Sequence, residues 1–367
     1  MISDLKKLIK FKTITGNFEE NDKALKWVKS KIDSKKYFIK EFKSEGYTSL
    51  VITAQRTIKP RIFLVAHMDV AKAENEMFVP KVKNNNLHAR GAFDMKYAIA
   101  CYLGILKELK NDSSKYDFGV MITTDEEYGG KNGVKFLLDR GFDCDVAFLP
   151  DGSENWKIEK ASKGVWCFVI KSHGRSAHPS MPWKGENALE TLMDYLCKLQ
   201  KGFKNEPCGD PLHIHSTMDV NEFNTGRTGD NLPDYAEAMV DIFFTSENEF
   251  KKIIKTEKEL RKKYPGLKLN TTILNPSVRM DTDNKYADEF YLMARKLYGI
   301  KKETMFTHGT SDAHYFIEKG ISVIETRPNG GDFHGDGEWI DLRDMERFYR
   351  VLKKFVERIA IIQNLSG

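Results

Sequence analysis

A histidine and an aspartate stand two residues apart at the end of an apolar run, a spacing that suits metal chemistry. Residues Arg61–Ala66 follow the chain breaker Pro60, and His67 and Asp69 come directly after them. In an extended segment, side chains two apart point the same way, so the Asp69 carboxylate can accept the ring N–H of His67. That bond would leave the other ring nitrogen for a metal ion. A polar residue at a strand end is more often only hydrogen-bonded, so this pair alone does not establish a site.

Acidic side chains follow two further predicted strands. Phe118–Thr123 runs into a pair of glutamates, and Asp145–Leu149 runs into an aspartate. In open α/β sheets, ligands bind outside the carboxyl ends of the strands, so these groups are expected to gather at one edge of a sheet. An aspartate that opens a predicted helix and a histidine in a Gly-rich loop complete the candidate metal ligands, which are His67, Asp94, Glu127, Asp151 and His334.

This ligand set indicates which ions would bind. Two imidazoles and three carboxylates, with no cysteine among them, suit Zn²⁺ and also Co²⁺ or Mn²⁺. A single catalytic zinc needs only three protein ligands, so five candidates favour two divalent ions that share a bridging carboxylate.

Glu126 and Glu127 are adjacent in a loop, where neighbouring side chains diverge. One of them can therefore bind metal while the other faces the substrate as a general base beside a metal-activated water. A Glu-Glu pair is usually only surface charge, but this one stands after an apolar strand and before Gly129-Gly130.

The elements that must position these residues fall into two predicted domains. Residues 1–162 and 276–367 carry all the candidate ligands, and residues 163–275 form an insertion. The insertion reads strand, helix, strand, strand, helix, strand, which is the split βαβ unit of ferredoxin-like domains. Its predicted elements are 164–172, 187–199, 212–220, 236–244, 249–264 and 267–273.

Composition restricts the class of protein. The chain has 367 residues, 41% of them hydrophobic, and a formal charge of +5 with acids and bases dispersed. No apolar run reaches membrane-spanning length, and the N-terminus carries charges throughout. The densest basic run, 251–263, alternates with glutamate as a solvated helix face does, so nucleic-acid binding is not expected. We expect a cytoplasmic protein with neither a membrane nor a nucleic-acid partner.

Several motifs, in order along essentially the whole chain, resemble those of the M20 metallopeptidases. This group includes acetylornithine deacetylase, succinyl-diaminopimelate desuccinylase, aminoacylase-1 and glutamate carboxypeptidases. The matching segments are HMD at 67–69, RGAFDMKYAIA at 90–100, TTDEEYGGKNG at 123–133, SHGRSAHPSMPWKGENAL at 172–189, DNLPD at 230–234 and FHGDGEWI at 333–340. The resemblance implies an α/β fold: a zinc-peptidase-like catalytic domain with a mixed central sheet flanked by helices, plus an inserted ferredoxin-like lid that also forms the dimer.

The resemblance also implies roles for individual residues. His67 and Asp151 would bind one metal ion, Glu127 and His334 the other, and Asp94 would bridge them. Asp69 would orient His67, and Glu126 would serve as general base and then as general acid.

In the lid, the resemblance implies that His178 donates to the oxyanion from the partner subunit of a homodimer. Asn231 would line the substrate pocket. Many members carry Asp-x-Arg on a lid strand, where the arginine holds the substrate carboxylate, but this chain has Phe243 at that position. Either the enzyme discriminates poorly between an N-acyl amino acid and its C-terminal amide, or Arg227, Arg279 or Arg327 has replaced that arginine.

We therefore expect a metal-dependent hydrolase that cleaves the amide bond of an N-acyl amino acid, as a deacetylase or desuccinylase does, or of a small peptide. A dipeptidase or carboxypeptidase of the same family and a non-catalytic peptide-binding relative remain alternatives. A related co-catalytic zinc aminopeptidase would use a similar ligand set, but the inserted lid argues against it.

Overall fold

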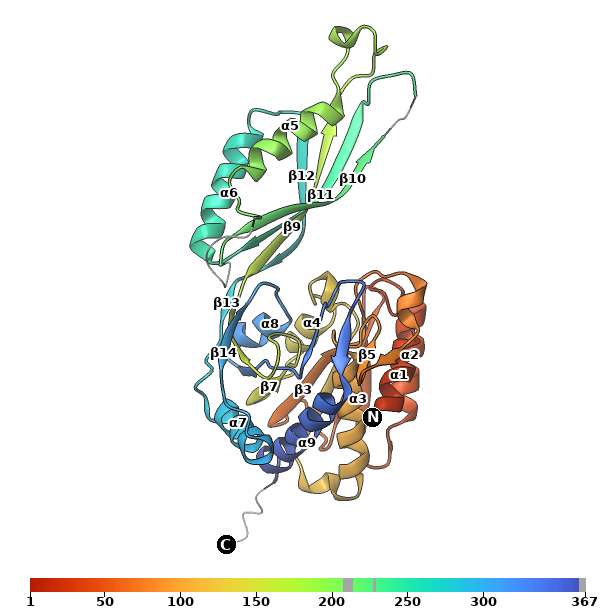
Figure 1. The fold of residues 1–367 in the computed structure, drawn as a ribbon, viewed down its shortest axis with the longest axis vertical. Coiled ribbons are helices and arrows are strands. Elements are labelled where there is room, and N and C mark those ends of the chain that lie inside the picture. Colours follow the sequence, from red (N-terminus) through yellow and green to blue (C-terminus); the bar gives the residue numbers. More distant parts are fainter. Residues whose placement is uncertain (207–213, 227–228, 363–367) are drawn as a thin grey trace. The chain divides into compact units, whose positions relative to one another are not determined.

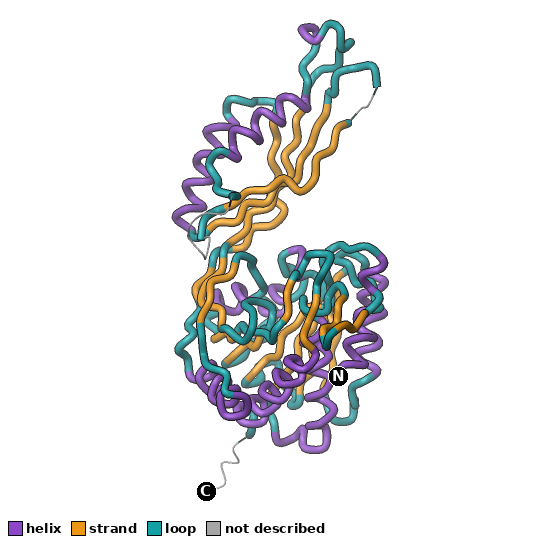
Figure 2. Tube along the Cα trace, viewed as in Figure 1, coloured by secondary structure: helices purple, strands orange, loops and turns teal. Residues whose placement is uncertain are grey.

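The computed structural model describes residues 1–206, 214–226 and 229–362. The chain divides into two compact units. Unit 1 comprises Met1–Lys160, Arg279–Thr307 and the chain from Ser311 onward, and unit 2 comprises Ala161–Val278 with His308–Thr310. Figure 1 traces both units along the chain, and Figure 2 shows their helices, strands and loops.

A mixed sheet forms the centre of unit 1, as the resemblance implies. Its strand order is β1 (Phe38–Ser44), β2 (Tyr47–Thr53), β6 (Phe118–Thr123), β3 (Ile62–His67), β7 (Val146–Phe148) and β15 (Ser322–Ile324). The β1–β2 and β2–β6 pairs are antiparallel, and β6, β3, β7 and β15 pair in parallel. Every residue of β3 and β6 is buried, as expected for parallel strands covered on both faces.

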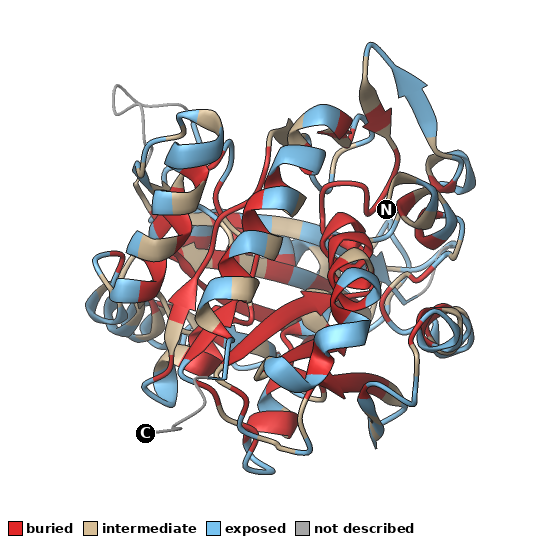
Figure 3. Cartoon of the chain, turned by 90° about the horizontal axis from the view of Figure 1, so that it is seen from below, coloured by how far each residue is buried: buried red, intermediate tan, exposed pale blue. Residues whose placement is uncertain are grey.

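Helices cover this sheet. Alternate residues of β3, such as Ile62 and Leu64, join one core with side chains from α1 (Ile2–Ile9), α2 (Phe18–Ser30), α3 (Lys96–Leu109), α7 (Lys285–Tyr298) and α9 (Leu342–Ile359). The intervening residue Phe63 packs instead on Phe142, after α4 (Val134–Leu138), and α4 contacts α8 (Ala313–Glu318). Figure 3 shows the buried strands between helices whose outer faces are exposed.

A small sheet that the sequence does not predict joins two distant loops. Its order is β16 (Gly330–Gly331), β17 (Trp339–Asp341), β5 (Asn86–His88) and β4 (Lys81–Lys83). Another sheet, β13 (Val278–Arg279), β8 (Ile158–Ser162) and β14 (Thr304–Thr307), forms where the chain leaves and re-enters unit 1. The first of these sheets carries the loop with His334 to the segment that leads into Asp94.

Unit 2 has the predicted ferredoxin-like order. Its antiparallel sheet runs β10 (Thr217–Thr225), β11 (Tyr235–Phe244), β9 (Gly164–His173) and β12 (Leu267–Asn275), with α5 (Ala188–Gln200) and α6 (Glu247–Arg261) on one face (Figure 1). Strand β10 extends beyond its predicted end at residue 220. It is an edge strand whose last residues are exposed and largely polar, so the sequence shows no apolar alternation there.

Candidate active site

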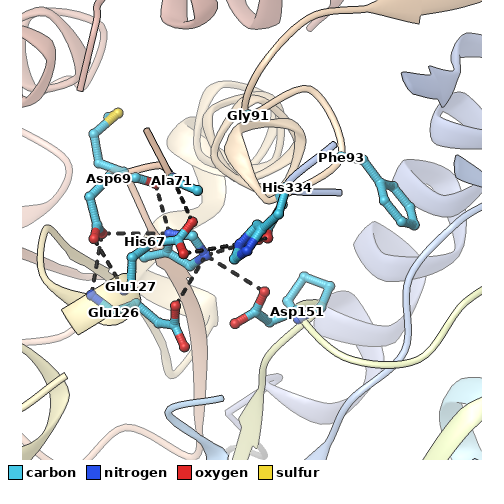
Figure 4. A network of polar contacts seen from close by, with 12 residues as sticks. His67, Asp69, Ala71, Gly91, Phe93, Glu126, Glu127, Asp151 and His334 are labelled. Carbon is cyan, nitrogen blue, oxygen red and sulfur yellow. Dashed lines mark hydrogen bonds and ion pairs between the residues drawn. The ribbon is translucent and has the colours of Figure 1, made fainter. Parts of the chain in front are cut away.

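The carboxyl ends of three parallel strands bring the candidate ligands of unit 1 together. His67 ends β3 and pairs with Thr123 at the end of β6, so the loop with Glu126 and Glu127 begins beside it. On the other side, Leu64 of β3 pairs with Phe148 of β7, and Asp151 follows that strand. Figure 4 shows these side chains and His334 converging on one another.

Asp94 lies between the two imidazoles. Its Oδ1 is 3.2 Å from Nε2 of His67, and its Oδ2 is 3.2 Å from Nε2 of His334. Each imidazole has a further carboxylate beside the same nitrogen: Asp151 Oδ1 is 3.6 Å from His67 Nε2, and Glu127 Oε2 is 3.0 Å from His334 Nε2. The arrangement is therefore two histidine–carboxylate pairs with one carboxylate shared between them.

Glu126 lies close to the first pair. Its Oε2 is 3.9 Å from His67 Nε2, and among the described residues its carboxylate groups with His67 and Asp151 as possible metal ligands. The other such group is Asp94, Glu127 and His334. The geometry thus places Glu126 where it can either ligate an ion or act on a water beside one.

Asp69 is fully buried behind these residues. Nδ1 of His67 is 2.9 Å from the Asp69 main-chain oxygen and 3.5 Å from its carboxylate Oδ1. The carboxylate itself accepts from the Thr15 hydroxyl at 2.8 Å and from the main-chain N–H of Glu127 at 3.2 Å. Asp69 therefore holds the glutamate loop as well as the His67 ring.

Carboxylates outnumber imidazoles in this cluster. Burial raises the pKa of Glu126 well above its usual range, and the charge of Asp151 adds to that effect. Burial opposes a charged His67, but Asp151, Asp69 and Asp94 outweigh it and raise the pKa of the ring. Divalent cations relieve the repulsion between carboxylates that are crowded in this way. The imidazole and carboxylate donors are those that Zn²⁺, Co²⁺ and Mn²⁺ accept. The residues therefore fit such ions.

Sequence reasoning missed two buried charges near the ligands. Arg90 and Glu338 form an ion pair at 2.8 Å, and both are buried. Each stands inside a motif quoted above, but a pairing between residues this far apart becomes visible only when the loops meet. Lys96 was also missed: its fully buried ammonium donates to the main-chain oxygens of Leu8 and Phe11.

The candidates that come from the insertion belong to unit 2. His178 is exposed, and its Nδ1 accepts the Ser180 N–H at 3.2 Å, so a neutral ring carries its proton on Nε2 as a donor. Asn231 is also exposed. It lies near His178 because the next residue, Leu232, donates its N–H to Ala177 O at 2.8 Å. Phe243 is half-buried in β11, and Arg227 lies outside the described residues.

Comparison with known proteins decides the family. The sequence pattern of peptidase family M20/M25/M40 matches residues 63–358. The chain belongs to this family. It is accordingly a metal-dependent hydrolase that acts on carbon–nitrogen bonds of linear amides or peptides.

Relatives in the family match over nearly the whole chain. Succinyl-diaminopimelate desuccinylase of Rickettsia akari (strain Hartford) is 27% identical over 97% of this chain and 98% of its own length. The enzyme of that name from Sulfurovum sp. (strain NBC37-1) is 24% identical over 96% and 97%. A metallo-carboxypeptidase of the M20 family from Sulfolobus solfataricus superposes with a TM-score of 0.80 at 18% identity, covering 98% of both chains. Human carnosine dipeptidase 1 superposes with a TM-score of 0.79 at 12% identity, covering 98% of this chain and 96% of its own.

These comparisons confirm the expected family and the expected fold, with its catalytic and ferredoxin-like parts. Within the described residues, no helix is long and apolar enough to cross a membrane.

Proposed function

We propose that this chain is a two-ion amide hydrolase that cleaves an N-acyl amino acid, as a deacetylase or desuccinylase does, or a small peptide. The observation that carries the proposal is the position of Asp94, with one carboxylate oxygen 3.2 Å from each imidazole and a further carboxylate beside each ring. A shared carboxylate between two histidine-containing ligand sets suits two divalent ions that lie close together.

In this proposal, His67 and Asp151 would hold one ion, Glu127 and His334 would hold the other, and Asp94 would be shared between them. When bound, such ions polarise the substrate carbonyl and make a water nucleophilic at neutral pH, and Zn²⁺ suits the donors best. Glu126 takes the proton of the attacking water and returns it to the leaving nitrogen. Burial among acids favours the protonated form of Glu126, which suits the second of these steps.

Residues of the insertion complete the proposed site. We assign residues 163–275 as a lid and dimerisation domain and residues 1–162 with 276–367 as the catalytic domain. His178, whose neutral ring carries a donor at Nε2, stabilises the oxyanion in a homodimer from the partner subunit. Asn231 lies in the segment hydrogen-bonded beside His178 and lines the substrate pocket in this proposal.

Recognition of a substrate carboxylate has changed in this chain, because Phe243 provides no donor. Arg327 is buried, and its Nε already donates to Ser153 O at 2.6 Å. Its guanidinium stacks on Phe93 and Phe333, which lie near the metal ligands. Arg279 is exposed in β13, and Arg227 is the third candidate. We favour an arginine that has taken over this role.

The test is a panel of N-acetyl and N-succinyl amino acids and of dipeptides, offered to the metal-loaded protein. Hydrolysis that stops when a chelator removes the ions and returns when Zn²⁺ is restored is the expected result. The preferred substrate then separates a deacylase from a dipeptidase or carboxypeptidase. Tight binding of these compounds without turnover, with both ions present, would instead establish the non-catalytic alternative.

A further inference from the structure

The buried ion pair between Arg90 and Glu338 joins the two loops that carry Asp94 and His334. Nη1 of Arg90 is 2.8 Å from Oε2 of Glu338, and the side chains are 2% and 0% exposed. Two charges withdrawn from water this far must be closely matched by hydrogen bonds, so the remaining partners of this pair are informative.

The carboxylate of Glu338 also accepts hydrogen bonds from the main chain around Asp94. Oε1 accepts from the N–H of Phe93 at 2.8 Å and of Asp94 at 3.0 Å, and Oε2 accepts from Gly91 N–H at 3.0 Å. Gly91 has φ +77°, and a Cβ there would lie 2.8 Å from Cγ1 of Val70. The turn before Asp94 is therefore wrapped around one carboxylate, which sets the position of the Asp94 main chain.

Arg90 makes the corresponding contact to the other loop. Its Nη2 donates to the main-chain oxygen of His334 at 2.8 Å. A guanidinium can contact a carboxylate and a carbonyl at once through separate N–H groups, whereas an ammonium acts as a single point charge. The pair thus fixes the backbone of Asp94 and the backbone of His334 relative to each other.

The two proposed ion sites depend on this pair to different extents. His67 lies on the buried strand β3, and Asp151 is the third residue after β7. His334 instead lies in a loop between the short strands β16 and β17, with φ +63° and a side chain that is 51% exposed. Its ring therefore depends more on its loop being held in place.

We infer that Arg90 and Glu338 are positioning residues that preorganise the ion site of Asp94, Glu127 and His334. This inference rests on the proposed two-ion function. It predicts that breaking the pair affects the two ions unequally. The affinity for the ion at His334 falls, and the affinity for the ion at His67 is kept.

The test is a calorimetric titration of metal-free protein with Zn²⁺, together with elemental analysis after dialysis. Wild type is expected to take up two ions. Glu338→Gln replaces one carboxylate oxygen by an NH₂ group, which cannot accept from the donors that faced that oxygen, whether Arg90 and Gly91 or Phe93 and Asp94. This variant should bind the ion at His334 about 10–100-fold more weakly, which is the usual effect of losing a group that orients a metal ligand. Arg90→Lys keeps the charge but cannot reach both partners, and should show the same selective loss.

Glu257→Gln provides the matched control. Glu257 is also a buried carboxylate, paired with Arg261 at 2.6 Å and with the Tyr195 hydroxyl at 2.9 Å, but it belongs to α6 of unit 2. It should lower the melting temperature and leave both ion affinities unchanged. Its melting temperature, beside those of the two test variants, separates general destabilisation from loss of one ion.

Three results would distinguish the possible failures. Two ions bound with wild-type affinity by both test variants, or an equal loss of both ions, would overturn the inference. If Glu338→Gln does not fold, Arg90→Lys decides by the same criterion. If wild type itself takes up no second ion, the proposed two-ion function fails, whatever the variants do.

Discussion

Substitution of Glu126 by glutamine separates the two roles that its position permits. The amide has the shape of the carboxylate, and the Glu126 main-chain N–H, 3.4 Å from Asp69 Oδ1, is not changed. What is lost is the ability to take a proton. A positioned acid–base group contributes roughly 10²–10⁴-fold to kcat. That range corresponds to about 2.7–5.4 kcal/mol in the activation free energy.

The surroundings of Glu126 predict a second effect with the opposite sign. Its side chain is only 14% exposed, and Asp151, Asp312 and Glu127 add negative charge around it. Folding must either protonate this carboxylate or bear the repulsion, and a neutral glutamine avoids both costs, so the metal-free variant should be at least as resistant to thermal unfolding as the wild type. An inactive protein of undiminished stability would show that the loss of kcat does not come from misfolding.

The assay compares kcat and ion content for Glu126→Gln and Glu127→Gln, both loaded with Zn²⁺. We expect Glu126→Gln to keep its ions and lose kcat, and Glu127→Gln to lose ion content, because Glu127 Oε2 lies 3.0 Å from His334 Nε2. If Glu126→Gln lost an ion instead, Glu126 would be a ligand, as its grouping with His67 and Asp151 permits. A kcat within about tenfold of wild type would refute a role as base.

Three further predictions concern assembly, specificity and pH. Inactive His178→Ala and inactive Glu126→Gln chains, when mixed, should regain part of the activity through hybrid sites; a fully active monomer in sedimentation would contradict this. The kcat/KM for an N-acyl amino acid should exceed that for its C-terminal amide, and Ala at Arg227, Arg279 or Arg327 should abolish the difference; a preference for the acid that survives all three substitutions would exclude these arginines. Burial lowers the pKa of His314 to about 4, although its Nδ1 donates to Ser311 O. Below the ordinary histidine pKa of about 6.5, the unfolded chain therefore binds a proton that the folded chain does not. The free energy of unfolding should fall as the pH decreases, by up to ~1.4 kcal/mol per pH unit. Urea unfolding at pH 7 and pH 5 should show a smaller loss of stability for His314→Asn than for wild type. Equal losses would contradict the lowered pKa of His314.

The parts of the fold that the sequence predicted correctly have strong periodic patterns. The alternating strands and amphipathic helices of 164–275 predicted the ferredoxin-like order. The apolar runs before His67 and before Glu126 predicted strands whose polar ends gather at one edge of a sheet, and these strands pair in the structure. The motifs along the chain were enough to recognise the family.

What the sequence did not show depends on contacts between distant segments. Strands as short as Gly330–Gly331 and Trp339–Asp341 have no detectable period, so the small sheet that carries the His334 loop was not predicted. Arg90 and Glu338 each resemble an ordinary surface charge, since such residues are seldom fully buried. Only the folded loops show that they neutralise each other.

The most direct test of the two-ion proposal is anomalous diffraction at the zinc absorption edge from crystals of the Zn²⁺-loaded protein. The account predicts two peaks in each chain, one bonded to His67 and Asp151 and the other to Glu127 and His334, with Asp94 bonded to both. A single peak, or peaks that do not include these residues, would contradict the account.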